Sequence, residues 1–325
     1  MIEISHLTKK FDNFVAVDDL SFKVAEGEVL GFLGPNGAGK STTMKVITGF
    51  LSATTGSVTV DGHDISREPL AVKSLIGYLP EGAPSYPDMT TLEFLNFIAD
   101  IRGYSGAEKQ RRIDKVVRDV ELASVCHKTI DTLSKGFKRR VGLAQAIIHD
   151  PKVLILDEPT DGLDPNQKHH VRRLIRNLAK DKIVIISTHI LEEVSAVCSR
   201  AVIIARGRIL ADGTPKELES RSAYFGAVSI RLTASFDLRA ALAGDPDVRE
   251  IEQADDSGMH FILLPTAGRH IFSKVAEKSQ NGHWPVAEFH LVGGLLEDYF
   301  RHVTQDSALT PSASAVISTT TEQQG

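Results

Sequence analysis

A glycine-rich segment near the start of the chain has the composition of a phosphate-binding loop. Residues 34–41 read Gly-Pro-Asn-Gly-Ala-Gly-Lys-Ser and match the pattern G-x-x-x-x-G-K-[ST]. An apolar run precedes this loop at residues 29–33, and a helix-compatible run follows it at residues 42–48. Glycines let backbone N–H groups turn toward phosphate oxygens, and the positive end of the following helix points at the same anion. The predicted phosphate-binding residues are Gly34, Asn36, Gly37, Ala38, Gly39, Lys40, Ser41 and Thr42.

Two side chains of this loop indicate that the bound phosphates belong to a nucleoside triphosphate with Mg²⁺. Lys40 would reach the β- and γ-phosphates of a nucleoside triphosphate, and the Ser41 hydroxyl would ligate Mg²⁺. The alternative is a glycine-rich turn that binds nothing. Strand, loop and helix follow one another in the required order, which favours the nucleotide site.

Two adjacent carboxylates follow a second apolar run. Asp157 and Glu158 come directly after residues 154–156, which read Leu-Ile-Leu. At the end of a strand, Asp157 suits the organisation of Mg²⁺, directly or through water. Glu158 lies one residue further, on the opposite side of the chain, where it could polarise an attacking water. A pair of solvated acids closing a strand is the alternative, and the upstream phosphate loop argues against it. We therefore expect hydrolysis of a nucleoside triphosphate with Mg²⁺.

The elements that must position these groups have an α/β pattern. From residue 1 to about 213, short β-branched runs alternate with helical periodicity. Continuous apolar runs at 29–33, 153–156 and 183–186 predict strands buried on both faces. Residues 22–24 and 57–60 alternate with a period of two, which predicts an antiparallel β layer. The predicted fold is a P-loop NTPase core with that layer and a mostly helical insertion at about 86–150.

The pattern weakens after residue 213, so we expect the first domain to end near residue 218. Candidate strands at 228–232, 261–264 and 287–291, with helices between them, predict a small α+β domain over 223–304. Residues 305–325 are mostly Ser, Thr, Ala and Gln and predict a disordered tail.

Composition narrows the class of protein and its compartment. The 325 residues include 37 basic and 42 acidic side chains, so there is no global positive field of the kind that nucleic-acid binders carry. Two cysteines do not make a disulfide framework and fit a reducing cytoplasm. No apolar run approaches the roughly 18 residues of a membrane helix, and the first residues lack a signal-peptide layout. Action on a membrane would therefore occur from the water side, through a partner.

In its order of motifs the chain resembles the ATP-binding subunit of an ABC transporter, over roughly residues 1–218. Residues 133–137, Leu-Ser-Lys-Gly-Phe, resemble the family signature, which is Leu-Ser-Gly-Gly-Gln in its commonest form. In the family this segment opens a helix whose N-terminus meets the γ-phosphate of ATP held by the other subunit. The resemblance implies that role for Ser134 and Gly136. Lys-Gly-aromatic at these places is similar to the exporter branch with the type-two permease class, including the gliding-motility subgroup.

The resemblance also implies roles for four single residues. Asp164, in the segment Asp-Gly-Leu-Asp, falls in the dimer-contact loop, and His189 matches the switch histidine that contacts the γ-phosphate. Phe11 matches the aromatic residue that stacks on adenine, where Tyr is commoner. Glu81 replaces the usual Gln that links Mg²⁺ and water to the helical insertion. Carboxylate oxygens suit Mg²⁺, so the implied metal residues are Ser41, Glu81 and Asp157.

Such a site is complete only in a pair of chains. The resemblance implies a symmetric head-to-tail dimer with a second copy, which ATP closes and hydrolysis, aided by Glu158, opens. It also implies integral membrane permease subunits as partners, a peripheral location on the cytoplasmic face of the inner (cell) membrane, and export as the direction. No nucleic acid is expected as a partner. Residues 86–89 would lie near the groove that receives a cytoplasmic helix of the permease.

Two other classes of function are open to a chain with these motifs. A soluble ABC ATPase of DNA repair, translation or cluster assembly usually has tandem motif sets, zinc inserts or coiled-coil arms, which this chain lacks. A regulatory protein with a dead site would not need Lys40, Asp157, Glu158 and His189 together. The domain at 223–304 could regulate, stabilise the dimer or dock a partner. Residues 294–300 resemble a short C-terminal helix of exporter ATPases, or form a plain amphipathic surface helix.

Overall fold

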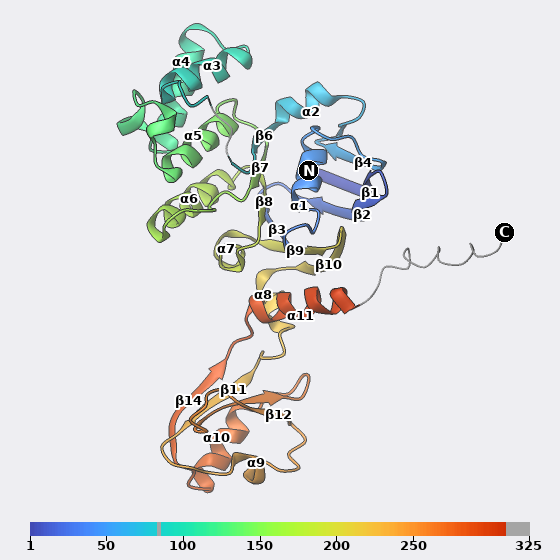
Figure 1. Cartoon of the computed structure of the whole chain (residues 1–325), viewed down its shortest axis with the longest axis vertical. Coiled ribbons are helices and arrows are strands. Elements are labelled where there is room, and N and C mark those ends of the chain that lie inside the picture. The colour runs from blue at the N-terminus through green and yellow to red at the C-terminus, as the bar shows by residue number, and fades with distance from the viewer. Residues whose placement is uncertain (83–85, 310–325) are drawn as a thin grey trace, which may run out of the picture. The chain divides into compact units, whose positions relative to one another are not determined.

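The chain divides into two compact units, here called unit 1 (Met1–Leu218) and unit 2 (from Glu219 onward). The computed structural model describes residues 1–82 and 86–309 (Figure 1). Among these residues, no helix has the length and apolar character needed to span a bilayer.

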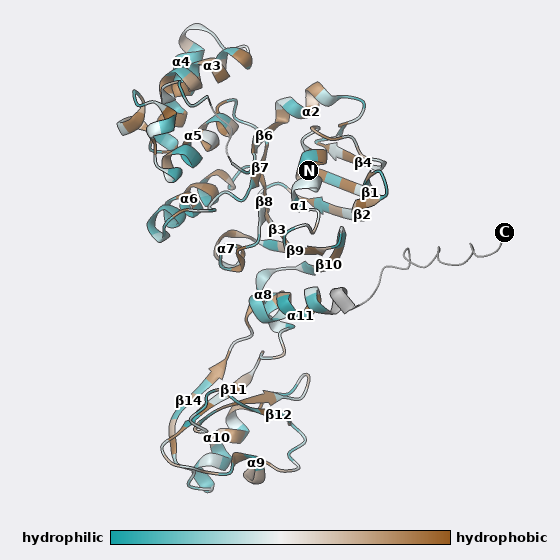
Figure 2. Cartoon of the chain, in the orientation of Figure 1, coloured by the Kyte–Doolittle hydropathy of each residue, from teal (hydrophilic) through white to brown (hydrophobic). Residues whose placement is uncertain are grey.

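A six-stranded sheet forms the centre of unit 1. Its five strands other than β10 run parallel, and β10 pairs antiparallel with β9 at one edge. The central strands β7 and β8 are buried on both faces and appear brown in the hydropathy view of Figure 2. The carboxyl ends of parallel strands meet at one edge of the sheet, which is where the predicted site residues follow the strands. In sheet order the strands are β10 (Arg208–Gly213), β9 (Arg200–Ala205), β3 (Val29–Leu33), β8 (Ile183–Thr188), β7 (Val153–Asp157) and β6 (Ile76–Leu79).

A four-stranded antiparallel layer covers one side of this sheet, as the period-two alternation predicts. Its buried residues, including Phe22 and Val58, form one core with α1 (Lys40–Ile47) and with sheet residues such as Phe32. Helix α2 (Pro69–Leu75) adds Val72 to the same core. In sheet order the strands of the layer are β2 (Phe14–Val24), β1 (Ile2–Phe11), β4 (Thr55–Val60) and β5 (His63–Asp64).

Helices cover the other side of the sheet, opposite β1, β2 and β4 (Figure 1). Their core joins Phe94 and Val116 to the sheet residues Leu154 and Ile186. Most of residues 86–150 is helical, as predicted from the interrupted strand rhythm. The helices on this side are α3 (Thr91–Ile101), α4 (Gly106–Asp119), the short 3₁₀ helices η1 (Ala123–Val125) and η2 (Ile130–Thr132), α5 (Lys135–Ile147), α6 (Pro165–Leu178) and α7 (Leu191–Val197).

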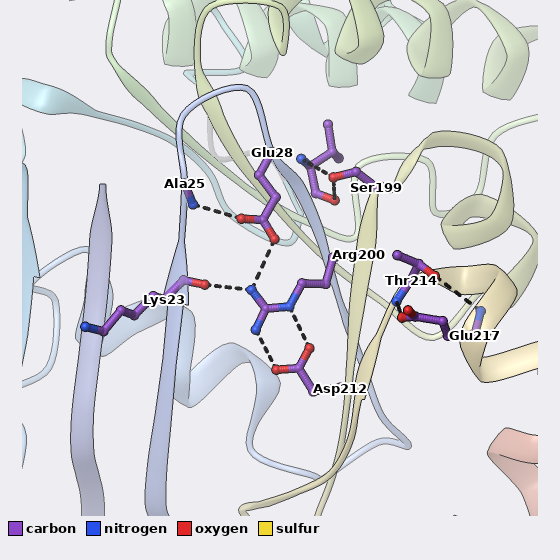
Figure 3. Close-up of polar contacts among 9 residues, drawn as sticks. Lys23, Ala25, Glu28, Ser199, Arg200, Asp212, Thr214 and Glu217 are labelled. Carbon is purple, nitrogen blue, oxygen red and sulfur yellow. Dashed lines mark hydrogen bonds and ion pairs between the residues drawn. The ribbon is translucent and has the colours of Figure 1, made fainter. Parts of the chain in front are cut away.

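One arginine ties the two sheets of unit 1 together (Figure 3). Arg200, at the start of β9, donates from Nε and Nη2 to the two carboxylate oxygens of Asp212, at 2.6 and 2.5 Å. Its Nη1 donates to the backbone carbonyl of Lys23 in β2, at 2.9 Å, and to Glu28 Oε1, at 3.2 Å. The hydrogen bonds with Asp212 raise the pKa of Arg200. A planar guanidinium can satisfy several acceptors at once, so it fixes the antiparallel layer against the edge of the parallel sheet.

Unit 2 is a small α+β unit built on a four-stranded antiparallel sheet. Alternate residues of its central strands, including Val228, Ile230 and Leu263, pack with Val275 of α10 in one core. In sheet order the strands are β12 (Val248–Gln253), β13 (His260–Pro265), β11 (Ala227–Leu232) and β14 (Val286–Val292). Helix α8 (Pro215–Ser220) crosses the boundary between the two units. The helices within unit 2 are α9 (Leu238–Ala241), α10 (Phe272–Asn281) and α11 (Leu296–Leu309).

Two features of this unit differ from the sequence prediction. Strand β12 was not predicted, because it is an edge strand whose register with β13 shifts between Val248 and Glu250 and whose residues are half-buried or exposed. Edge strands do not require the apolar alternation that marks a half-buried strand. The tail was predicted to be disordered from residue 305, but α11 continues to Leu309. The rest of that predicted tail, 310–325, lies outside the described residues.

Candidate nucleotide-binding site

The phosphate loop connects β3 to α1 with a backbone that leaves no room for side chains at two glycines. Gly39 has φ of 104° and directly precedes α1, and a Cβ placed there would lie 2.5 Å from the carbonyl oxygen of Ala16. A Cβ on Gly34 would lie 2.4 Å from the carbonyl oxygen of Ile204. The first N–H groups of α1 have no partner within the helix. The loop therefore packs tightly against β2 and β9 while its backbone stays available to an anion.

A cavity of about 550 Å³ opens over this loop. It brings together most of the predicted loop residues with Glu81, Glu158 and His189, which come from three other parts of the sequence. Three of its residues were not predicted as site residues: Phe14, Ala16 and Asp161. The residues that line the cavity are Phe14, Ala16, Asn36, Gly37, Ala38, Gly39, Lys40, Ser41, Thr42, Glu81, Glu158, Asp161 and His189.

Lys40 lies at the base of this cavity with its side chain buried. Its Nζ donates to the carbonyl oxygen of Gly34 at 2.7 Å and to that of Pro35 at 3.3 Å. Burial lowers the pKa of Lys40, because the charged form is poorly solvated there. Three nearby carboxylates oppose this change, namely those of Glu158, Asp157 and Glu81. The ammonium group is thus directed into the loop by backbone carbonyls, close to where phosphate oxygens would lie.

The two predicted carboxylates occupy the end of β7 and the residue after it. Asp157 is paired with Ser187 of β8 in the sheet register, and both Asp157 and Glu158 are buried. Within the described part of the chain, Asp157 Oδ1 and Glu158 Oε2 have no hydrogen-bond partner. Buried polar atoms are nearly always satisfied in proteins, so two such oxygens beside a phosphate loop fit a site that binds a cation and a water.

A second cavity, of about 390 Å³, adjoins the predicted metal residues. Ser41, Glu81 and Asp157 all line it. The described residues contain no group of three His, Cys, Asp or Glu side chains able to hold a metal by themselves. A hydroxyl and two carboxylates are hard oxygen donors, the kind that Mg²⁺ prefers together with water and phosphate oxygens.

His189 follows β8 and lies against Glu158. Its Nδ1 is 3.0 Å from Glu158 Oε1, and its ring is half-exposed while the carboxylate is nearly buried. The backbone N–H of Glu158 donates to the carbonyl oxygen of Ser187 at 2.8 Å. One oxygen of Glu158 is therefore engaged by the histidine, and the other, Oε2, is buried without a partner among the described residues.

Sequence reasoning missed Arg139, which lies in α5 behind the carboxylates. Its Nη2 donates to the carbonyl oxygen of Glu158 at 2.8 Å, and its Nη1 donates to that of Pro80 at 3.1 Å. In sequence it belongs to the run Lys-Arg-Arg at 138–140, which by itself is typical of a solvated helix face. Only the packing of α5 against the ends of β6 and β7 distinguishes it from its neighbours.

The predicted adenine-stacking residue does not line the cavity. Phe11 and Phe14 pair across the β1–β2 hairpin, and only Phe14 contributes to the cavity wall. Phe11 is 42% exposed and Phe14 is 63% exposed. The Nζ of Lys9 lies 5.0 Å from the centre of the Phe11 ring. Both rings are accessible to a ligand, and Phe14 is the one beside the phosphate loop.

Ser134, Gly136 and Asp164 also lie outside the cavity walls. Ser134 precedes α5 and accepts a hydrogen bond from the N–H of Phe137 at 3.4 Å, and Asp164 precedes α6 and accepts one from the N–H of Gln167 at 2.9 Å. A Cβ on Gly136 would lie 2.6 Å from Cδ of Gln167. The N-termini of α5 and α6 are thus packed side by side, and neither contributes to the cavity of its own chain.

Comparisons with known proteins identify the family. The family described as "ABC transporter" matches residues 17–161, and one described as "AAA domain, putative AbiEii toxin, Type IV TA system" matches residues 128–195. The uncharacterized ABC transporter ATP-binding protein YxlF of Bacillus subtilis (strain 168) is 40% identical over 221 residues, which cover 68% of this chain and 73% of YxlF. The linearmycin resistance ATP-binding protein LnrL of the same organism is 35% identical over 265 residues, covering 81% of this chain and 84% of LnrL.

A solved structure has the same fold. It is described as the structure of the ATP binding subunit of an ABC transporter, and it superposes with a TM-score of 0.62 at 31% identity, covering 68% of this chain and 92% of that one. The phosphate loop, the buried carboxylates and the histidine are arranged here around one cavity. The chain therefore belongs to the ATP-binding subunits of ABC transporters, and it is an ATPase.

Proposed function

We propose that two copies of this chain bind ATP between them and drive a separate permease embedded in the membrane. The observation that carries this proposal is that the predicted site residues lie in two separate places on one chain. Lys40, Glu158 and His189 share one cavity, whereas Ser134 and Asp164 stand at helix N-termini away from it. Helix N-termini attract anions, so the N-terminus of α5 is suited to a phosphate held by the other copy, in a head-to-tail dimer.

Within one copy, the loop and Lys40 would hold the phosphates, and Phe11 or Phe14 would stack on the adenine. Ser41, Asp157 and Glu81 would hold Mg²⁺, which when bound neutralises charge on the phosphate oxygens. Glu81 carries one more negative charge than the usual Gln. The nearby cationic side chains of Lys40 and Arg139 offset that charge.

Glu158 is the proposed general base. Its Oε1 lies against His189, and its buried Oε2 has no hydrogen-bond partner among the described residues, so Oε2 is the oxygen that can accept a proton from water. His189 would hold the carboxylate in place and contact the γ-phosphate through the rest of its ring. Replacement of Glu158 by Gln should leave ATP binding intact and trap the closed dimer, measured by gel filtration with ATP. Hydrolysis near the wild-type rate in this variant would exclude Glu158 as the base.

A mostly apolar groove of about 520 Å³ is the proposed docking site for a cytoplasmic helix of the permease. Phe50 and Ile101, 71% and 65% exposed, line it together with Tyr78, and exposed apolar side chains that lie together are typical of an interaction site. Residues 86–89 were predicted near such a groove. The described residues of that segment do not line it, and the ring of Tyr86 instead packs against Phe97.

Export is the proposed direction of transport, and the cytoplasmic membrane face is the proposed location. The name of LnrL includes resistance to linearmycin, which supports export for a chain 35% identical to it. Assignment to the gliding-motility subgroup stays a prediction from the residues 134–137. For unit 2, regulation, dimer stabilisation and docking of a partner all stay predictions.

The permease proposal can be tested by purification. The tagged chain would be isolated with ATP from membranes solubilised in mild detergent, and the proteins that accompany it identified. A stoichiometric polytopic membrane protein is the expected result, and Phe50→Asp should release it while leaving ATP binding unchanged. Recovery of a bare homodimer or of soluble partners alone, with full ATPase activity, would instead favour a soluble ABC ATPase.

A further inference from the structure

Arg139 makes its two side-chain hydrogen bonds only to backbone oxygens of the site. The residue is 8% exposed, although it lies in α5 one turn after the residues predicted to meet the other copy. Its Nη2 bond to Glu158, 2.8 Å long, is buried, and its Nη1 bond reaches Pro80, the residue before Glu81. A buried arginine is costly unless its donors are satisfied. The side chain therefore joins α5 to both segments that carry predicted active-site carboxylates.

The backbone of Glu158 has a conformation that needs such support. Its φ is 49°, in the left-handed region that residues other than glycine rarely adopt. Such conformations are energetically unfavourable and persist where the surrounding structure enforces them. The N–H of Glu158 donates to Ser187, and its carbonyl oxygen accepts from the N–H of Asp161 at 3.2 Å as well as from Arg139. Of these three contacts among the described residues, the one from Arg139 involves a side chain, and the other two are made by backbone groups.

The charge of Arg139 is matched to its surroundings. Burial lowers the pKa of its guanidinium, and nearby carboxylates oppose that change, those of Asp161, Asp157, Glu81 and Glu158. A guanidinium remains protonated at any physiological pH. It therefore adds a fixed positive charge beneath a group of carboxylates that would otherwise repel one another.

We propose that Arg139 is a positioning residue for ATP hydrolysis: it holds the left-handed backbone of Glu158, and so aims its carboxylate, while tying that residue to α5 and to the loop of Glu81. This inference rests on the proposed role of Glu158 as the base. It explains why α5, whose N-terminus is proposed to meet the phosphate of the other copy, also contacts the proposed general base Glu158 of its own chain. A movement of α5 would then change the position of Glu158 directly, through Arg139.

The test compares Arg139→Gln and Arg139→Lys with Arg112→Gln, a matched control. Arg112 is a partly buried arginine of the same helical region that pairs with Glu108 and does not contact the site. Steady-state ATPase assays would give kcat and KM, and equilibrium titration would give the ATP affinity. Arg139→Gln should lower kcat by about 10- to 100-fold with ATP affinity changed by less than about threefold. Arg139→Lys, which keeps the charge and one donor, should recover part of kcat, and Arg112→Gln should match the wild type.

A double variant separates positioning from general damage. Because Arg139 acts through Glu158, Arg139→Gln should have little further effect on the residual hydrolysis of Glu158→Gln. An unchanged kcat in Arg139→Gln, a parallel loss of kcat and ATP affinity, or an equal loss in the Glu158→Gln background would each overturn the inference. If Arg139→Gln does not fold, Arg139→Lys carries the same comparison. Rapid hydrolysis by Glu158→Gln alone would instead refute the proposed function of the base.

Discussion

The Nδ1 atom of His189 lies 3.0 Å from Oε1 of Glu158, across the edge of the sheet between β8 and the end of β7. The ring is half-exposed and the carboxylate is nearly buried, and both residues line the same cavity. One ring nitrogen is engaged by Glu158, which leaves Nε2 for another partner. Because the two side chains are in contact, we expect them to act together in hydrolysis.

This contact predicts non-additive effects in a double-mutant cycle. His189→Ala and Glu158→Gln should each lower kcat by about 100-fold or more. The double variant should be little worse than the poorer single variant, because either change already breaks the unit. Single-turnover ATPase rates of the four proteins give the coupling. Additive losses would show that the two residues act on separate steps.

The burial of Lys40 leads to a prediction that separates binding from folding. Burial lowers the pKa of Lys40, so the folded state disfavours its charge and should tolerate a neutral side chain of similar length. Lys40→Met should weaken ATP binding by about tenfold or more, since charge-assisted hydrogen bonds to phosphate are lost. The thermal midpoint without nucleotide should not fall. Titration with ATP and a thermal melt check the two statements, and a melt lowered as much as the affinity would contradict this account.

The two aromatic residues of the β1–β2 hairpin give competing predictions for which ring stacks on the adenine of ATP. Phe14 lines the cavity and Phe11 does not, so the geometry favours Phe14, whereas the family resemblance favours Phe11. Stacking of a base on an aromatic ring is worth about 1–3 kcal/mol. Phe11→Ala and Phe14→Ala should therefore differ by about tenfold in ATP affinity, measured by titration under identical conditions. The variant with the larger loss of ATP affinity identifies the stacking residue, and equal affinities would mean that neither ring alone holds the adenine.

His149 should make the stability of unit 1 sensitive to mild acid. Burial, together with the positive charges of Arg102 and Arg112, lowers the pKa of His149 from 6.5 to about 4. Well above pH 6.5 the histidine is neutral in both states, so its titration does not affect stability. As the pH falls toward 4, the unfolded chain takes up a proton that the folded chain refuses, and the free energy of unfolding decreases by up to about 1.4 kcal/mol per pH unit.

The comparison uses His149→Gln, whose amide can still donate to the carbonyl oxygen of Ile76, the present partner of His149 Nε2. Urea unfolding followed by circular dichroism above pH 7 and below pH 6 should show a smaller loss of stability for the variant than for the wild type. The same pH dependence in both proteins would mean that His149 is not the group that titrates.

The sequence by itself determined the parts of this protein that depend on neighbours along the chain. The strand, loop and helix around Gly34 and Lys40 are contiguous, and each has its own local pattern, so both the fold class and the phosphate site followed from them. The same holds for Asp157 and Glu158, because a continuous apolar run predicts a buried strand, and the residues after it must emerge at the edge of the sheet.

Only the tertiary structure decided which distant groups meet. Arg139 reaches Glu158 across 19 residues of sequence, and of the paired residues Phe11 and Phe14 only Phe14 lies beside the phosphate loop and lines the cavity. Strand β12 forms by pairing with β13, although its own pattern is weak. In each case the outcome depends on how segments that are separate in sequence pack together, and periodicity along one segment carries no information on that packing.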